Sequence, residues 1–469
     1  LAYYRFVSES AIAFCRMQSD IIRKYKKPGD FITTNGMFDH LDNHRMMDEA
    51  LDVYTYDSYP NFAYCLSEDP VHNRDLNDRK WSSHLSRVRS VCPHFGIMEQ
   101  QSGANGWNTR MEAPAPKPGQ MTLWAMQSIA HGADYVSFFR WRTCTVGTEI
   151  YWHGILDYDN RDNRKLREIR ALHERLRSIR ELAGAAYRAS FGVLEDYDNL
   201  WDADVDVWHR RVEKASKKEI FAASQLSHTP MDYVLLTDDT EYGDLKDYPV
   251  LFYPHGLILT ERRAKLLRDY AEKGGCLIIG ARTGQKEEHG RCVMMPMPGE
   301  LAQLSGTSVE EFTFVGAMDG QVCMEWNGKK LDTGIFNDIL ETEKEDVKVL
   351  ACFASNYYEG KPALTERAVG EGRVIHFGGT FTRDTVQALL SYLGILEPYR
   401  AQLELPEECE LCVREKNGKQ YFFILNYSPE EQEIRVKQEM IDMFSGEKIC
   451  GAVRLTGYNV LCLESVTTL

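Results

Sequence analysis

The chain has 469 residues, 43 % of them hydrophobic and 27 % charged, and it carries a formal net charge of −15. This length accommodates about two to four domains, and the composition is that of an ordinary globular protein. The acidic excess argues against nucleic acid or an anionic membrane surface as a partner, and no apolar run of about 18 residues is present to span a membrane.

Residues 1–184 alternate helical and β-rich stretches. After a helical stretch at 9–25 come four β-rich runs, each followed by a helical stretch: "FITTNG", "LDVYTYDSYP", "PHFGIMEQQ" and "YVSFFRWR". Apolar strands that alternate with helices predict parallel strands buried on both faces. The pattern is typical of half of a (β/α)8 barrel or of an open doubly wound sheet. In both folds ligands bind at the carboxyl ends of the strands.

Two finer expectations concern the end of this block. The helix within "GQMTLWAMQSIAHGAD" should be amphipathic and should end at Gly132, because glycine readily adopts the left-handed conformation that follows a helix. The fourth run is too apolar to be half exposed, so we expect it in the interior.

Residues 185–398 predict a second domain, a small α/β sheet of the flavodoxin or amidotransferase type. Its strands are expected in "MDYVLLTDD", "YPVLFYPHG" and "GGCLIIGAR". Thr260 can cap the helix between the last two strands, and Gly274 can end it. An amidotransferase nucleophile would lie at a strand-to-helix elbow, whereas Cys276 begins a strand, so a buried thiol is the better interpretation.

Residues 403–469 alternate apolar and polar positions and predict a small antiparallel β domain, in which "KNGK" is a hairpin signal. Cys409 and Cys412 are the only close pair among twelve scattered cysteines. No second ligand pair follows them, so we expect no metal there. Scattered cysteines favour reduced thiols, and hence a cytoplasmic protein.

Glu99 is the leading candidate for a chemical role. It follows an apolar run and would point into the mouth of a barrel, where the loops converge. Gln100, Gln101 and Ser102 are expected to hold the carboxylate ionised through hydrogen bonds. Trp107 follows in a loop of glycine and asparagine, and an aromatic face beside carboxylates and amides is typical of a sugar site. The alternative is an exposed acid at a strand end.

Two other strand ends carry candidate residues. Asp57 and Tyr59 lie two positions apart and so face the same side of an extended segment, although Asp-Ser-x-Pro is also a turn signal. Arg140, Glu149 and His153 follow the fourth run in a segment that also holds two tryptophans, which favours a ligand site. An ion-pair cluster is the alternative for the charged members, and a lone histidine predicts no metal site.

Together these segments resemble glycoside hydrolase family 42, the β-galactosidases. The resemblance is carried, in the family's order, by "FITTNGMF", "LDVYTYDSYP", "GIMEQQSGANGWN", "MTLWAMQSIAHGADYVSFFRWR" and "GTEIYWHGILDYDNR". It implies strands five to eight of a (β/α)8 barrel in residues 1–184, an α/β trimerisation-type domain in 185–398 and the small β domain in 403–469. It also implies retaining hydrolysis of terminal β-D-galactosides, oligosaccharides among them, by a homotrimer.

The resemblance implies roles for single residues. Glu99 matches the catalytic nucleophile, at the end of the seventh barrel strand. The residues expected to bind the sugar are Asp57, Tyr59, Trp107, Arg140, Glu149 and His153. Glu149 and His153 match an acid and a histidine that bind galactose hydroxyls, although their spacing here is wider than in the family.

The sequence departs from the family in one large respect. A retaining glycosidase needs a second carboxyl about 5 Å from the nucleophile, which donates and then accepts a proton. In the family this glutamate follows an asparagine at the end of the fourth strand, and no Asn-Glu pair occurs in this chain. Strands one to four and the family's zinc-binding cysteines would also lie outside the chain. We therefore expect no cofactor here, and an isolated chain that is incomplete and inactive or unstable.

Two other interpretations stay open. A chain that lacks the acid/base could be a non-catalytic subunit for galactoside binding or assembly. Specificity for α-L-arabinopyranosides is a further alternative, because this sugar lacks only the C6 group, and one missing group changes specificity modestly in an apolar subsite.

Overall fold

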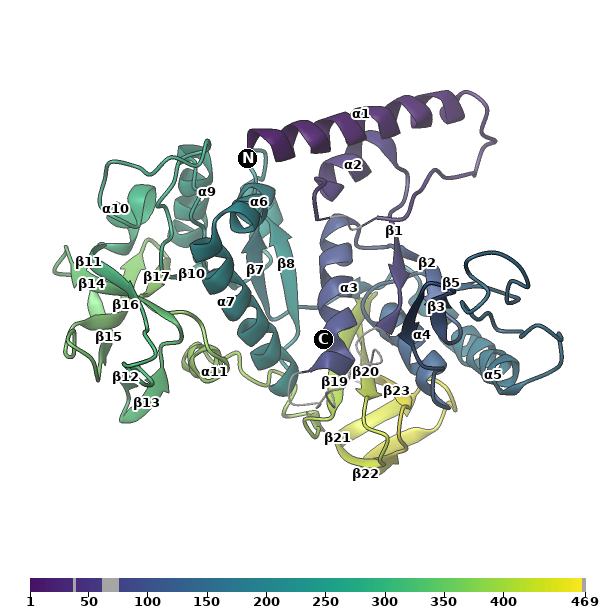
Figure 1. The fold of residues 1–469 in the computed structure, drawn as a ribbon. Coiled ribbons are helices and arrows are strands. Elements are labelled where there is room, and N and C mark those ends of the chain that lie inside the picture. Colours follow the sequence, from purple (N-terminus) through teal and green to yellow (C-terminus); the bar gives the residue numbers. More distant parts are fainter. Residues whose placement is uncertain (37–38, 61–75, 466–469) are drawn as a thin grey trace. The chain divides into compact units, whose positions relative to one another are not determined.

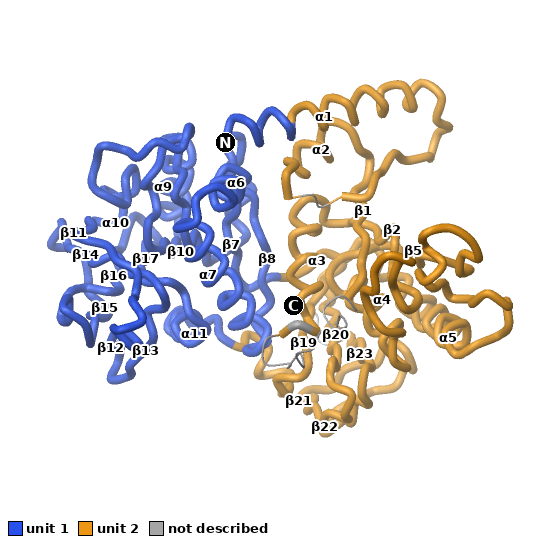
Figure 2. Tube along the Cα trace, in the orientation of Figure 1, with its two compact units in different colours: residues 1–8, 189–396 blue, residues 9–188, 397–469 orange. Residues whose placement is uncertain are grey.

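The computed structural model describes residues 1–36, 39–60 and 76–465, which form two compact units (Figure 2). We call residues 1–8 and 189–396 the α/β unit, and residues 9–188 and 397–469 the barrel unit. The C-terminal segment thus packs with the barrel strands. No helix in the described part of the chain is long and apolar enough to cross a membrane.

The barrel unit contains a parallel sheet of three strands in the order β1-β2-β5. The strands are β1 (Thr55–Ser58), β2 (Gly96–Gln101) and β5 (Tyr135–Phe139). A full strand in "FITTNG" was a wrong expectation, because this run forms a single parallel bridge from Asn35 to Thr55. Backbone bonds join the run to the β1 segment, among them those from Gly36 N–H to the carbonyl of Thr55 at 3.0 Å and from Asp52 N–H to that of Ile32 at 2.9 Å. Hydroxyl groups add to them: Thr55 donates to the carbonyl of Thr34 at 2.8 Å, and its hydroxyl lies 3.0 Å from that of Thr33.

Helices alternate with these strands, as the sequence predicts (Figure 1). They are α1 (Ala2–Arg23), which begins in the α/β unit, α2 (Asn43–Ala50), α3 (Lys80–Val91), α4 (Gln120–Ala130) and α5 (Arg164–Ser178), with 3-10 turns η3 (Asn77–Arg79) and η4 (Arg180–Leu182). Asp42 and Asn163 cap α2 and α5 by accepting a bond from the backbone N–H three residues later. Gly132 follows α4 with a φ of 120°, as expected of a helix terminator.

A second sheet in the barrel unit has the order β18-β21-β23-β20-β19-β6, with β22 beside β21. Its strands are β6 (Ala186–Tyr187), β18 (Leu403–Glu404), β19 (Cys409–Lys416), β20 (Lys419–Asn426), β21 (Gln432–Asp442), β22 (Lys448–Leu455) and β23 (Val460–Ser465). The predicted hairpin is confirmed: Asn417 and Gly418 join β19 to β20 with φ values of 54° and 75°, as a tight hairpin turn requires.

Two burial expectations were wrong, for related reasons. Helix α4 is buried along its whole length rather than amphipathic, because it contacts β2 and β5 and also β19 and β20 of the second sheet. Strand β5 is only half buried despite its apolar sequence, because it is an edge strand of the three-stranded sheet.

The α/β unit contains a nine-stranded sheet with five parallel strands in the order β17-β10-β9-β7-β8. These are β7 (Phe191–Glu195), β8 (Met231–Leu235), β9 (Val250–Tyr253), β10 (Cys276–Ile279) and β17 (Gly372–Phe377). Antiparallel β16 (Pro362–Val369), β15 (Lys348–Phe353), β12 (Cys323–Trp326) and β13 (Lys329–Asp332) extend the sheet beyond β17. A separate ribbon pairs β11 (Thr307–Phe314) with β14 (Phe336–Thr342). The parallel part has the flavodoxin-like strand order.

The helices of this unit are α6 (Tyr197–Val205), α7 (Val207–Leu226), α8 (Tyr242–Leu245), α9 (Glu261–Glu272), α10 (Ala302–Ser305), α11 (Arg383–Tyr392) and the 3-10 turn η5 (Gly299–Leu301). The expected ends of α9 are confirmed: Thr260 accepts a bond from the N–H of Arg263 at 3.2 Å, and Gly274 follows the helix with a φ of 109°.

The thiol of Cys276 is expected to be chemically inert. Cys276 begins β10, its side chain is buried, and burial raises the pKa of the thiol to about 12. The thiolate is the reactive form, so alkylation of the native chain at pH 8 should be at least about 100-fold slower at Cys276 than at the exposed Cys292 and Cys450. Peptide mass spectrometry after a timed iodoacetamide pulse measures the ratio, and comparable rates at the three sites would contradict the buried assignment.

Candidate active site

Glu99 lies in β2 and is half buried, close to the carboxyl end of the strand. Its hydrogen-bond donor is Tyr59, whose hydroxyl lies 2.5 Å from Glu99 Oε2. Burial, followed by the bond to Glu99 and its charge, raises the pKa of Tyr59 far above the usual range. Tyr59 therefore stays protonated and is the hydrogen-bond donor to the carboxyl group of Glu99.

The sequence predicted that Gln100 and Ser102 donate hydrogen bonds to the Glu99 carboxylate, and this was wrong. Gln100 donates to the carbonyl of Ser58 at 3.2 Å, and Ser102 donates to the carbonyl of Phe139 at 2.7 Å. Both side chains are fully buried and satisfy backbone acceptors of the neighbouring strands. They fix the end of β2 between β1 and β5.

Asp57 lies directly across from Glu99 on the neighbouring strand β1. Asn35, at the bridge beside β1, donates its side-chain N–H to Asp57 Oδ2 at 2.6 Å. Burial raises the pKa of Asp57 to about 6, and the charge of Glu99 acts in the same direction. Two carboxyl groups thus stand side by side at the end of this sheet.

Three aromatic side chains form a wall beside these carboxyls. Trp152 packs edge to face on Tyr59 with ring centroids 5.2 Å apart, and Trp107 lies 4.7 Å from Trp152. Trp107 ends β3 (Asn105–Trp107), which pairs with β4 (Arg110–Ala113), so a short ribbon rather than an irregular loop holds the indole. Apolar ring faces beside acids suit the C–H faces and hydroxyl rim of a sugar.

The segment after β5 carries the remaining predicted residues. Arg140 forms an ion pair with Glu149 and also donates to the sulfur of Cys144. His153 Nδ1 lies 3.1 Å from Asp157 Oδ1, to which Lys165 donates at 3.0 Å. The ion-pair arrangement given as the alternative for Arg140 and Glu149 is therefore present, and a sugar-binding role for them stays a prediction.

Close backbone approach brings this segment to the end of β2. A Cβ atom added at Gly103 would lie 2.6 Å from both the carbonyl oxygen and the Cβ of His153. The hydroxyl of Ser102, whose shorter bond goes to the carbonyl of Phe139, also lies 3.1 Å from the carbonyl oxygen of His153. The glycine thus places His153 within reach of the strand that carries Glu99.

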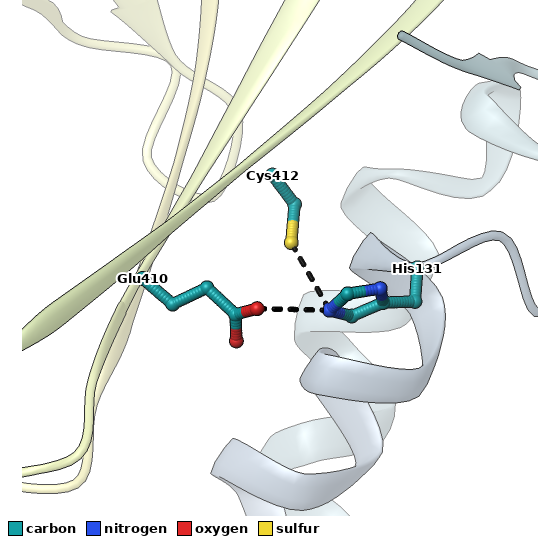
Figure 3. A group of neighbouring side chains, drawn as sticks. All are labelled: His131, Glu410 and Cys412. Atoms are coloured by element: carbon teal, nitrogen blue, oxygen red, sulfur yellow. Dashed lines mark hydrogen bonds and ion pairs between the residues drawn. The ribbon is translucent and has the colours of Figure 1, made fainter. Parts of the chain in front are cut away.

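The barrel unit contains a second cluster of reactive groups, formed by His131, Glu410 and Cys412 (Figure 3). All three are buried, and His131 Nε2 lies 3.0 Å from Glu410 Oε1 and 3.4 Å from Cys412 Sγ. These residue types can bind a metal ion, but Arg89 donates to His131 Nδ1 at 3.1 Å. That bond places the imidazole proton on Nε2, which then donates to Glu410 and has no lone pair for a metal. The cluster is a hydrogen-bonded charge network.

The structure therefore brings Glu99, Tyr59 and Asp57 together and places Trp107 in the adjoining aromatic wall. Sequence reasoning missed Asn35 as a partner of Asp57 and did not select Trp152. Asn35 lies in "TTNG", a polar strand end, and Trp152 lies in the polar segment after the fourth run. Their positions at the expected strand ends were the sequence feature that could have selected them as site residues.

Carboxyl groups and aromatic rings at the carboxyl ends of parallel barrel strands define the class of (β/α)-barrel glycoside hydrolases. Family models described as beta-galactosidase, beta-galactosidase trimerisation domain and beta-galactosidase C-terminal domain match residues 1–179, 230–396 and 409–464 in turn. The chain belongs to glycoside hydrolase family 42.

Individual relatives agree with this assignment. Beta-galactosidase BgaA of Clostridium cellulovorans is 28% identical over 470 residues, which cover 99% of this chain and 69% of the relative. Beta-galactosidase bgaB of Geobacillus kaustophilus is 28% identical, with 99% and 67% covered. The chain thus spans about two thirds of the length of these relatives.

Solved structures show the same fold. The beta-galactosidase of the haloarchaeon Halorubrum lacusprofundi superposes with a TM-score of 0.82 at 25% identity, covering 100% of this chain and 68% of that one. Gan42B, a GH42 beta-galactosidase, superposes with a TM-score of 0.87 at 23% identity, covering 99% and 67%.

Proposed function

We propose that this chain carries the nucleophile half of a retaining β-galactosidase site, with Glu99 as the nucleophile. The observation that carries the proposal is the hydrogen bond from Tyr59 to Glu99 at a barrel strand end, beside the wall of Trp107 and Trp152. Family membership makes terminal β-D-galactosides, as in oligosaccharides, the proposed substrates.

In the proposed reaction Glu99 attacks the anomeric carbon of the galactosyl group from the face opposite the leaving group. The bond to the aglycone oxygen breaks, and that oxygen takes a proton from an acid/base carboxyl supplied from outside these 469 residues. Water then breaks the galactosyl ester after losing its proton to the same carboxyl, so two inversions retain the β configuration. Tyr59 orients the attacking carboxylate through its 2.5 Å bond.

Trapping of the intermediate tests this role directly. A 2-fluoro galactoside with a dinitrophenolate leaving group should label Glu99 as an ester in the enzyme that contains this chain, and peptide mass spectrometry locates the label. A label on any other residue would refute the assignment. Calorimetric galactose binding without any turnover would favour the binding-subunit alternative.

Replacing Tyr59 with phenylalanine should lower kcat/KM by about 10- to 100-fold, because a hydrogen bond to a charged group is lost. The loss should appear mainly in kcat, since the bond orients the nucleophile for the chemical step. Tyr25→Phe is the matched control, because Tyr25 is 82% exposed. Steady-state kinetics on a nitrophenyl β-galactoside measure both, and equal effects of the two variants would contradict the positioning role.

We further propose a homotrimer that works in the cytoplasm without a cofactor. The trimer is supported by the match to the trimerisation-domain model, and light scattering of the purified enzyme tests it. Free cysteines throughout the described residues support a reducing compartment. Double displacement by two carboxyl groups needs no metal. Comparison of kcat/KM for a β-D-galactoside with kcat/KM for an α-L-arabinopyranoside tests which of the two sugars the enzyme prefers.

A further inference from the structure

Asp57 is a second carboxyl group beside the proposed nucleophile, and its environment differs from that of Glu99. The two residues are direct partners in the parallel pairing of β1 and β2, so their side chains lie on the same face of the sheet. The register shifts between Tyr56 and Asp57, which places Asp57 rather than Ser58 opposite Glu99. If both carboxyl groups ionise, this pairing places two negative charges next to each other.

The hydrogen bonds of Asp57 are incomplete for a carboxylate. Asn35 donates to Oδ2 at 2.6 Å, whereas Oδ1 is buried and has no hydrogen-bond partner among the described residues. Leaving a buried ionised oxygen without a donor is costly. A proton on Oδ1 removes the charge and turns that atom into a donor, so the geometry fits the neutral acid better than the carboxylate.

We propose that Asp57 is a positioning residue that holds a proton beside Glu99 in the empty site and releases it when Glu99 becomes an ester. The release step rests on the proposed function of Glu99, whereas the pairing of the two carboxyls does not. Asp57 is distinct from the acid/base, because the proton donor and the attacking carboxylate must flank the glycosidic bond, and a residue on the adjacent strand stands beside the nucleophile.

The balance of charge and protons follows from the chemistry. When Glu99 bonds to the anomeric carbon it loses its negative charge, while the aglycone leaves with the bonding electron pair. The repulsion that favoured protonated Asp57 then disappears, and the Asp57 proton passes to solvent water. Hydrolysis of the ester restores the Glu99 carboxylate and returns a proton to Asp57.

Within residues 1–36, 39–60 and 76–465, few groups face Asp57, and this makes the expectation specific. Glu99 acts from β2 and Asn35 from the bridge segment, and Tyr59 lies two residues away with its proton directed to Glu99. Burial and the charge of Glu99 raise the pKa of Asp57 to about 6, whereas the bonds from Asn35 and from the backbone N–H of Glu99 act in the opposite direction. Removing Glu99 or Asn35 should therefore move the titration of Asp57 in opposite directions.

Carbon NMR of protein labelled at the aspartate carboxyl tests the pairing without any turnover. The Asp57 signal is the one missing from Asp57→Asn, and we expect its midpoint near pH 6. Glu99→Gln should lower this midpoint by on the order of one pH unit, and Asn35→Ala should raise it. Glu112→Gln, on β4, is the matched control and should leave it unchanged. A wild-type midpoint below pH 4.5, or no response to Glu99→Gln, would overturn the proposal.

Proton release on trapping tests the second step. At pH 6 the dinitrophenolate leaves as an anion, so the leaving group consumes no proton. A pH indicator should report more protons released per ester in the wild-type enzyme than in Asp57→Asn, and equal release would overturn the release step. If the label formed on a residue other than Glu99, the proposed function would fail, and the NMR titration would still decide the pairing.

Discussion

Replacing Glu99 with alanine is expected to lower kcat/KM for a nitrophenyl β-galactoside on the order of 10⁴-fold in the enzyme that contains this chain. Alanine cannot form the galactosyl ester, so the double displacement loses its first step. Glu99 is half buried, and the substitution leaves its backbone pairing with Asp57 on β1 in place, so the fold should persist. Steady-state rates together with circular dichroism separate lost chemistry from lost structure.

Added azide sharpens this experiment. A small anion can occupy the space left by the carboxylate and attack the anomeric carbon once, and a single inversion gives the α-galactosyl azide. Glu174→Ala is the control, because the side chain of Glu174 on α5 is 69% exposed. Near-normal activity of Glu99→Ala, or a β-configured azide product, would show that another group is the nucleophile.

The sequence correctly predicted those helix ends and turns that are determined by residues adjacent in the chain. Thr260 and Gly274 bound α9, and Asn417 with Gly418 forms the β19–β20 hairpin, because caps and tight turns depend on a few consecutive residues. Glu99 could be selected for the same reason, since the end of an apolar strand is visible in the sequence.

Features that depend on distant residues could not be predicted in this way. The amphipathic pattern expected for α4 ignored β19 and β20, which follow it by almost 300 residues and bury its second face. The donor to Glu99 is Tyr59, 40 residues earlier, rather than the adjacent glutamines. Asn35 bonds Asp57 across 22 residues, and no local pattern marks that pair.

A long-range contact of this kind, between His131 and Glu410, spans 279 residues and leads to a prediction about stability. Glu410 on β19 is 1 % exposed and accepts bonds from Ser82 on α3 and from Tyr427, which directly follows β20, both at 2.7 Å, besides the bond from His131. One buried carboxylate thus joins the C-terminal sheet to α3, which contacts β1, and to the end of α4, which contacts β2 and β5.

Replacing Glu410 with glutamine should destabilise the protein by about 3 kcal/mol at pH 7. Burial alone would raise the pKa of Glu410, but the interaction with His131 and the hydrogen bonds from His131, Tyr427 and Ser82 outweigh it and lower the pKa to about 2. A carboxyl whose pKa is lower in the folded than in the unfolded state stabilises the fold above its unfolded pKa. That stabilisation should therefore be lost as the pH falls from about 4.5 towards 2.

Urea unfolding followed by tryptophan fluorescence measures this difference as a function of pH. The gap between wild type and Glu410→Gln should be full at pH 7 and should narrow below pH 4.5, because protonation removes the wild-type advantage. The exposed Glu174→Gln should stay within about 0.5 kcal/mol of wild type at every pH. A gap that is small at pH 7, or constant down to pH 3, would mean that the Glu410 charge does not hold the C-terminal sheet to the barrel helices.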